Sequence, residues 1–303
     1  PLHGIPVILK DVFDTADMPT TGGYIPLDGV KPSKDATIVA RLRAAGAIML
    51  AKVNLSDWFG NPDIMASSTL GGSTLNPFGL STTSGLISRA GQMWSYITGE
   101  RGGPMAHSVY DLAATLDVIA GFDSDDLWTA QSLGKMPMTS YVSFINPDGL
   151  RGARVGVLKE AWAFTPADPA VIEMAKRAIG VWSEHGAVVI DPVSLDIDLV
   201  GYLANNGFPA RFERIQAVQQ YLDRHGPEYP IKTARQLLLD HPGVPERPAD
   251  REHLEQPIDL DRDPKYRAAL EGKARLREAI VGLMDRFGLD ALIYPHKLHG
   301  PLP

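Results

Sequence analysis

A short apolar run stands near the start of the chain, where Ile5-Pro6-Val7-Ile8-Leu9 leads directly into Lys10 and Asp11. A segment rich in Asp, Thr, Pro and Gly follows over residues 14–23. An apolar run of this length, closed by polar and turn-forming residues, is typical of a buried β-strand. Lys10 therefore ends a predicted strand, where it is either solvated or desolvated for use as a base. The pattern alone favours the solvated lysine, because most lysines keep the amine in water.

The next segments predict a helix followed by a second strand. Apolar residues recur at helical spacing over residues 35–45, with Asp35 placed to cap the first turn and Gly46 placed to end the helix. Residues 47–51 form another short apolar run, which predicts a second buried strand. Two strands joined through a helix at this distance are typical of a parallel crossover unit.

The same alternation continues to the end of the chain. A helix start is expected near Ser56, and residues 60–92, rich in Gly, Ser, Thr and Asn, are expected to be loop. Further helices are predicted over 108–120, 168–185, 199–222, 233–240 and 264–287, and further strands over 154–158, 187–190 and 290–295. Helices that alternate with short apolar strands predict the α/β class.

Composition narrows the classes of partner. The chain has 303 residues, of which 44% are hydrophobic and 21% charged, and this predicts a globular core. The net charge of −7 and the lack of a basic stripe argue against direct binding of nucleic acid. Without cysteine the chain has no disulfide, thiolate metal site or cysteine nucleophile. No apolar run approaches the length of a membrane span. Compartment and oligomeric state stay open, with a cytoplasmic location favoured and a homodimer among the alternatives.

Several sequence blocks resemble the amidase signature family. They are Gly4 to Asp11, Thr20-Thr21-Gly22, Lys52-Val53-Asn54, Asn76-Pro77-Phe78, Gly85-Leu86-Ile87-Ser88-Arg89, and Gly103 to Asp111. The blocks follow the order of the family, densely from residue 3 to 122 and more thinly to about 294, and ordered blocks are more specific than a single motif. The resemblance implies one α/β domain over residues 1–303. Its expected core is a mixed, mainly parallel twisted sheet covered by helices on both faces.

The resemblance also implies a chemistry. The family hydrolyses carboxamides through a Ser, cis-Ser, Lys triad and an acyl-enzyme, with a small-molecule amide as substrate and without a cofactor. Lys10 matches the block that carries the lysine, which must be neutral to act as a base, and burial lowers the pKa of a lysine. The lysine takes a proton from the cis-serine, which activates the nucleophilic serine. Backbone N–H groups of a Gly-rich loop bind the oxyanion.

The two serine-bearing tracts of the family have no match in this chain. In the family a Gly-Gly-Ser-Ser-Gly-Gly loop and a second Gly-Gly-Ser tract follow the Asn-Pro-aromatic step. Here Phe78 is followed at once by Gly79 to Arg89, which resembles a block beyond the nucleophile. We therefore expect a few dozen residues after Phe78, and further residues before Pro1 and beyond Pro303. The alternative is a true deletion, which would leave Lys10 without its serines.

Other residues are weaker candidates for the site. Met65, Ser67 and Ser68 are expected to border the substrate pocket, although residues 67–73 also suit a Gly-permitted turn with local hydrogen bonds, and Met65 equally suits the core. His296 and His299 could suggest a metal pair. No third ligand cluster accompanies them, so we expect a surface loop and no metal.

Four charged residues have expected structural roles. Arg89 and Asp111 are expected to form ion pairs in the wall of the site. Lys52 is a second lysine at a strand end and matches a family position outside the triad. Asp11 either orients Lys10 or caps a turn, and strand alternation would point it away from Lys10.

The sequence leaves three functional hypotheses. The first is an amidase that uses Lys10 as its base. The second is the amidase subunit of a tRNA-dependent amidotransferase, which would need a partner subunit. The third is a catalytically inactive homologue that serves as a binding or scaffold protein, and it follows if the deletion after Phe78 is real.

Overall fold

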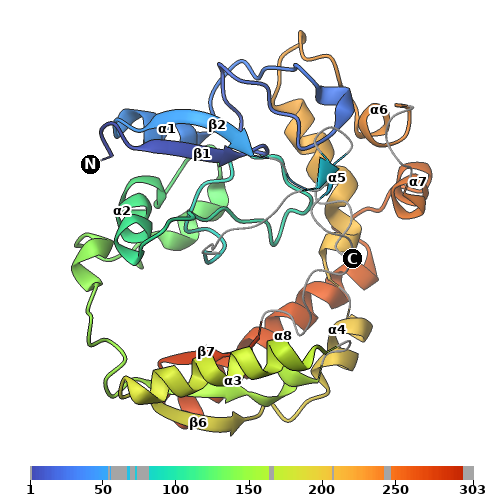
Figure 1. The fold of residues 1–303 in the computed structure, drawn as a ribbon. Helices are drawn as coiled ribbons and strands as arrows, with labels where there is room; N and C mark the ends of the chain where they lie inside the picture. The colour runs from blue at the N-terminus through green and yellow to red at the C-terminus, as the bar shows by residue number, and fades with distance from the viewer. Residues whose placement is uncertain are drawn as a thin grey trace. The chain divides into compact units, whose positions relative to one another are not determined.

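The computed structural model describes residues 2–53, 55, 67–68, 72–73, 82–163, 167–206, 208–241 and 247–295. Its contacts divide the chain into two compact units. Unit 1 consists of residues 1–145 and 210–258, and unit 2 of residues 146–209 and 259–303. Both units contain parallel strands and helices, labelled in Figure 1, so the predicted α/β class is confirmed. A single domain over residues 1–303 stays a prediction.

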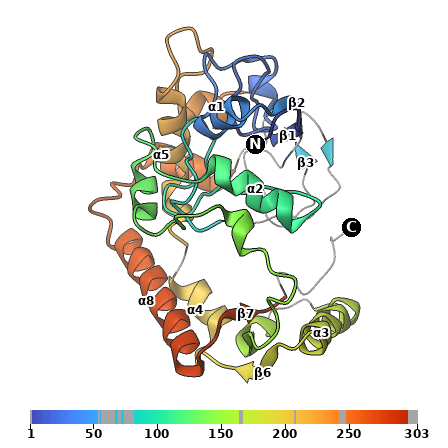
Figure 2. The ribbon, with the colours of Figure 1, turned by 90° about the vertical axis from the view of Figure 1, so that its left-hand side faces the viewer.

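Unit 1 begins with the predicted crossover unit. Strands β1 (Pro6–Lys10) and β2 (Ile48–Val53) pair in parallel, and α1 (Thr37–Ala44) connects them. Figure 2 shows α1 beside this strand pair. Leu9 points into a cluster with residues of α1 and is 4% exposed, whereas Ile8 and Leu50 are 54% and 63% exposed. The prediction of fully buried strands is therefore wrong for one face, because among the described residues only the other face packs against a core cluster.

The start of α1 also differs from the prediction. Ala36 is the N-cap residue, and no side chain caps the helix. Asp35 lies one position earlier, and its carboxylate accepts hydrogen bonds from the backbone N–H of Ala16 (2.8 Å) and from Nε of Arg43 (2.9 Å). It thus fastens the loop after β1 to the helix. Gly46 follows the helix end with φ of +89°, a conformation that favours glycine, as predicted.

The rest of unit 1 is mainly helical. It contains α2 (Val109–Ile119), α5 (Ala210–Asp223), α6 (Ala234–Leu238) and α7 (Pro248–Glu255), together with the short pair β3 (Ser67–Ser68) and β4 (Gly72–Ser73) and the 3-10 turns Ile25–Leu27, Leu127–Ser132 and Tyr141–Phe144. The helix predicted over 199–222 is two helices, of which the second is α5. Helix α7 was not predicted.

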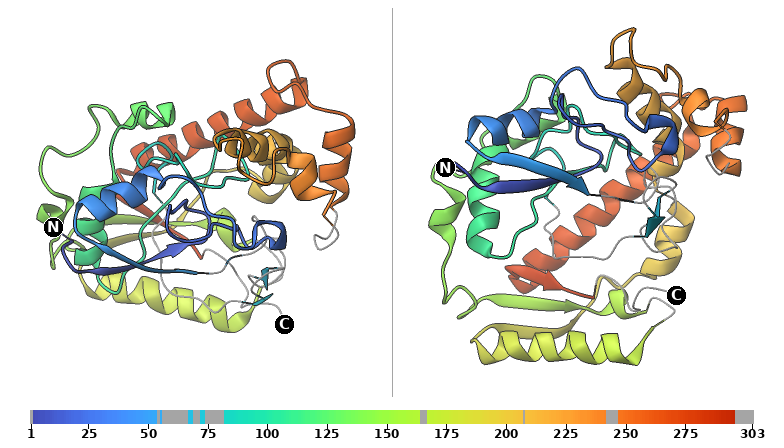
Figure 3. Two further views of the ribbon diagram at one scale, coloured as in Figure 1. Left: turned by 90° about the horizontal axis from the view of Figure 1, so that it is seen from above. Right: turned by 45° about the horizontal axis from the view of Figure 1, so that its top comes forward.

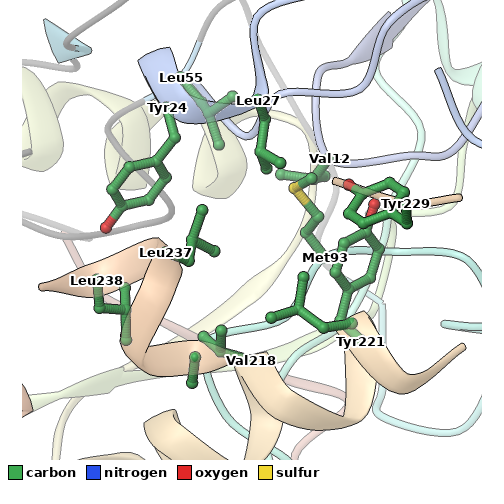
Figure 4. Packing of buried hydrophobic residues seen from close by; sticks show 12 residues of the cluster. Val12, Tyr24, Leu27, Leu55, Met93, Val218, Tyr221, Tyr229, Leu237 and Leu238 are labelled. Carbon is green, nitrogen blue, oxygen red and sulfur yellow. The ribbon is translucent and has the colours of Figure 1, made fainter. Parts of the chain in front are cut away.

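The main core of unit 1 joins its two chain segments. The fully buried Val12, Leu27 and Met93 from the first segment pack with Val218 and Tyr221 of α5. Figure 4 shows these side chains together, with the rings of Tyr221 and Tyr229 next to each other. Helix α5 thus packs against the loop that follows β1. Because Val12 in that loop is part of this core, the packing holds the backbone just beyond Lys10 in place.

Unit 2 is built on a three-stranded parallel sheet. Strand β5 (Arg154–Leu158) lies between β6 (Val188–Val193) and β7 (Ala291–Ile293). The helices are α3 (Pro169–Glu184), α4 (Leu199–Asn206) and α8 (Pro264–Phe287), with a 3-10 turn at Lys159–Trp162. Figures 2 and 3 show α3 and α8 on opposite faces of the sheet. Within the described ranges the strands form separate sheets, whereas one sheet was expected. None of the helices described is long and apolar enough to cross a membrane.

Candidate active site

Lys10 is the last residue of β1, where the chain leaves the sheet. Its carbonyl accepts a hydrogen bond from the N–H of Phe13 (3.2 Å), and the N–H of Asp11 donates to the carbonyl of Val53 (3.0 Å). A turn thus begins directly after the lysine while β2 still holds the backbone. The strand pair fixes the Cα position of Lys10, opposite Val53.

The surroundings of Lys10 lower the pKa of its amine. Burial among protein atoms lowers the pKa of Lys10, and the charge of Glu100 opposes this by favouring the ammonium form. The residue still keeps an exposed surface, and water there also favours the ammonium form. Lys10 is therefore partly desolvated. It lies between the fully solvated lysine and the desolvated base that the sequence left open.

Glu100 is a member of this site that the sequence did not reveal. It is 8% exposed, and its Oε2 accepts a hydrogen bond from the backbone N–H of Ser95 (3.3 Å). Burial raises the pKa of Glu100, while that hydrogen bond and the positive charges of Lys10, Arg101 and Arg89 lower it. Each of the two groups thus favours the charged form of the other, while burial opposes the charge on both. Glu100 lies in a Gly-rich loop without periodicity, and its place just before the Gly103 block was the only available signal.

Lys52 differs from Lys10 in its partners. Its Nζ lies 2.9 Å from Oδ1 of Asp11 and donates to the carbonyl of Pro19 (2.8 Å) and the hydroxyl of Thr20 (2.5 Å). Asp11 also accepts hydrogen bonds from Thr21. These bonds hold Lys52 as a structural ammonium between β2 and the loop after β1. They also occupy the carboxylate of Asp11.

Arg89 has the structural role predicted for it. Its guanidinium pairs with Asp126 at 2.9 Å, with both side chains at most 5% exposed, and it donates to the carbonyl of Ile97 (2.6 Å). The guanidinium also lies over the rings of Trp94 and Trp128, at 4.5 and 5.3 Å from their centres. This cluster anchors the loops that lead to Glu100.

The ion pair predicted for Asp111 is wrong. Among the residues that the structure describes, Asp111 makes no ion pair. Instead its N–H donates to Oγ of Ser108 (3.1 Å), and that hydroxyl donates to the carboxylate of Asp111 (2.7 Å). Asp111 thus stabilises the N-terminus of α2, where a negative charge is favourable.

Several predicted site residues cannot be placed around Lys10. The backbones of Ser67 and Ser68 form β3, paired antiparallel with β4. Met65, His296, His299 and the junction after Phe78 lie outside the described residues. Within the described part of the chain, no group of three acidic or histidine side chains could hold a metal ion.

Comparison with known proteins identifies the family. The family model Amidase matches residues 1–85 and 78–303, and this chain belongs to that family. The predicted membership is therefore confirmed.

Individual relatives agree with this assignment. A glutamyl-tRNA(Gln) amidotransferase subunit from Rhodopirellula baltica is 30% identical over 233 residues, covering 63% of this chain and 46% of the relative. A putative amidase of Arthroderma benhamiae is 26% identical over 378 residues, covering 100% and 61%. The native peptide amidase of Stenotrophomonas maltophilia has a TM-score of 0.79 and 29% identity, covering 97% of this chain and 71% of that structure. The chain thus spans about half the length of the amidotransferase subunits it matches.

The comparisons also bear on the break after Phe78. The two matched segments of the family model meet at residues 78–85, where the sequence joins two distant family blocks. The alignment with the Arthroderma benhamiae protein runs over 378 positions, whereas this chain has 303 residues, so at least 75 positions have no counterpart here. The relative therefore contains residues that this chain lacks.

Proposed function

We propose that this protein hydrolyses a carboxamide C–N bond with Lys10 as the base. Membership of the Amidase family supports the reaction, and the lowered pKa of Lys10 at the end of β1 supports its role. A base must be able to lose its proton near neutral pH, and desolvation favours the neutral amine. Lys52 is the poorer candidate, because Asp11 and two further oxygens bind its ammonium group.

In the proposed mechanism Lys10 withdraws a proton from a serine hydroxyl. That serine activates a second serine, which attacks the carbonyl carbon of the amide, and the leaving nitrogen departs with a proton. Water then releases the carboxylic acid from the acyl-enzyme. Glu100 can hold the proton that Lys10 gives up before the reaction, which leaves Lys10 as a neutral amine. The pair gains one positive charge when Lys10 takes the serine proton, and it loses that charge when the proton passes on to the leaving nitrogen. The two serines have no assigned positions within residues 1–303.

The first substrate class to test is a peptide with a C-terminal carboxamide. The likeness to the Stenotrophomonas maltophilia peptide amidase supports this choice. Aryl and aliphatic amides are the alternatives. Met65, Ser67 and Ser68 remain proposed neighbours of the substrate, and we propose no cofactor and no metal for the reaction.

Two other functions have support from particular observations. The putative amidase of Arthroderma benhamiae contains positions that this chain lacks. Their absence supports a catalytically inactive homologue that acts as a binding or scaffold protein. The likeness to amidotransferase subunits supports an amidase subunit that would act with a partner. A partner requirement predicts that turnover appears only when that subunit is added.

The test begins with the intact mass of the purified protein and its ammonia release from a peptide carboxamide. For an active enzyme, Lys10→Ala should lower kcat by about 10²- to 10⁴-fold, the usual contribution of a general base. Lys135→Ala removes an exposed lysine of the same unit and should leave kcat unchanged. Equal turnover of wild type and Lys10→Ala would remove Lys10 from the mechanism. An inactive protein with a mass of 32.8 kDa would support the inactive homologue.

A further inference from the structure

A cavity of about 370 Å³ lies within unit 1, apart from the residues assigned to the Lys10 site. Its wall is formed by the loop after β1, by α1 and the residues before it, by residues 90, 91 and 125, and by the segment that follows α5. Asp14, Lys34, Arg224 and His225 are among the lining residues. No residue of unit 2 is among the described residues that line it.

Asp14 and His225 form the buried part of the wall. Their side chains are 6% and 7% exposed, and Oδ2 of Asp14 lies 3.7 Å from Nε2 of His225, which is longer than a hydrogen bond. Oδ1 of Asp14 accepts a hydrogen bond from the hydroxyl of Tyr221 (2.7 Å). Nε2 of His225 is buried and has no hydrogen-bond partner among the described residues. This nitrogen has almost no exposed surface, so His225 would be a neighbour of a ligand in the cavity and Nε2 would not contact it.

Two cations, Lys34 and Arg224, also belong to the wall. Within the described ranges, the side chains of Lys34 and Arg224 make no ion pair. Both nevertheless act on the buried part of the wall, because their charges lower the pKa values of Asp14 and His225. An anion in the cavity would therefore meet two positive charges that no described residue pairs with.

The remaining charges of the wall are mostly engaged. Arg41 donates to the carbonyl oxygens of residues 119–122, and Asp35 pairs with Arg43. Asp125 is exposed and makes no ion pair in the described part of the chain. Asp125 opposes a second negative charge on a ligand, so the wall suits a monoanion better than a dianion.

The same wall has an apolar part. Ala40 and Ala44 of α1 and Ala90 line the cavity with methyl groups, which suit a short hydrocarbon body. We propose that this cavity binds a short-chain aliphatic carboxylate, with its carboxylate at Lys34 and Arg224 and its alkyl body against Ala40, Ala44 and Ala90. The proposal does not depend on the proposed amidase activity.

Butyrate is a suitable probe, with butyramide as its neutral counterpart and butylammonium as its cationic one. Isothermal titration calorimetry on the full chain should show that butyrate binds at least tenfold more tightly than either control. Arg224→Gln should weaken butyrate binding by roughly tenfold, and Lys34→Gln should weaken it by a smaller factor because Lys34 is exposed. Lys31→Gln removes a nearby exposed lysine outside the cavity wall and should leave butyrate binding unchanged.

A second readout follows the histidine ring by NMR. Arg224, Lys34 and Lys232 lower the pKa of His225 in addition to burial, and Asp14, Tyr221 and Tyr229 also face the ring. Bound butyrate would offset the cations, so the titration midpoint of the His225 ring should move to higher pH with butyrate and not with butyramide. Butyramide or butylammonium binding as tightly as butyrate would overturn the proposal. Unchanged butyrate binding in Lys34→Gln and Arg224→Gln, or an unmoved titration, would overturn it too.

Discussion

Asp14 is the residue through which pH should act most strongly on stability. Burial raises the pKa of Asp14 from 3.8 to about 7, although the Tyr221 hydrogen bond and nearby cations lower it. The folded protein therefore keeps a proton on Asp14 up to about pH 7, while the unfolded chain releases it above about pH 4. This contribution to stability is fully present below the unfolded pKa, and it is lost as pH rises through the folded pKa. Its size is roughly 4 kcal/mol.

The substitution Asp14→Asn removes the titratable carboxyl group and keeps the shape of the side chain. The amide oxygen can still accept the hydrogen bond that Tyr221 donates at 2.7 Å. Near pH 4 the variant should unfold with a free energy within about 1 kcal/mol of wild type, the typical net value of one hydrogen bond. At pH 8 it should be more stable than wild type by several kcal/mol, because only the wild type has lost its contribution.

The titration of His225 changes stability with pH in the opposite direction to that of Asp14. Burial, followed by the charge of Arg224, lowers its pKa from 6.5 to about 4. Its contribution is present above about pH 6.5 and is lost as pH falls through about 4. In wild type, between about pH 4 and 6.5, the titration of Asp14 lowers the free energy of unfolding as pH rises, and the titration of His225 raises it. In Asp14→Asn the stability should therefore rise between pH 4 and 6.5.

Urea unfolding followed by tryptophan fluorescence, from pH 4 to 8, measures these slopes. Asp28→Asn changes an exposed carboxyl group of the same unit and should follow wild type at every pH. A difference between Asp14→Asn and wild type that stays constant from pH 5 to 8 would show that Asp14 does not hold a proton in the folded protein. The pH argument would then fail.

Substitutions at four further positions test the packing of unit 1 by urea unfolding. Asp126→Ala leaves the buried guanidinium of Arg89 without its 2.9 Å partner and should cost about 3–5 kcal/mol. Ser108→Ala removes the cap of α2 and should cost about 1 kcal/mol, with Ser108→Asn restoring most of it. Leu237→Ala opens a cavity at a fully buried position and should cost about 2–5 kcal/mol. Leu50→Thr changes a side chain that is 63% exposed and should cost less than about 1 kcal/mol; a larger loss would mean that this face of β2 is covered.

The sequence predicted element types well because periodicity and end signals act locally. Ser108, Gly121, Asp168 and Gly186 mark the ends of two helices close to where the structure has them, at Val109–Ile119 and Pro169–Glu184. The single helix predicted over 199–222 was wrong because it ignored Asn205-Asn206-Gly207-Phe208-Pro209, a run that is typical of a helix end. The structure places the two halves of that stretch in different units. Contacts between distant segments decide that division, and no local pattern records them.

Burial was harder to predict than secondary structure. The apolar run of β1 is typical of a parallel strand covered on both faces, yet Ile8 is 54% exposed. An apolar run shows which faces suit burial, and it does not show whether a neighbour is present to bury them. For the same reason Glu100 could not be foreseen, because its burial and its effect on Lys10 depend on a loop about 90 residues further along the chain.

The two lysines of the strand pair show what the structure adds to the resemblance. Burial lowers the pKa of both, so desolvation alone does not choose the base. Lys52 lies against three oxygen atoms, and the charge and hydrogen bond of Asp11 favour its charged form. Among the described residues, Glu100 acts on Lys10, and burial raises the pKa of Glu100 itself. A carboxyl group with a raised pKa takes up a proton more readily, and once neutral it no longer favours the ammonium form of its neighbour. This difference between Glu100 and the oxygen atoms around Lys52 supports the proposal that Lys10 is the base.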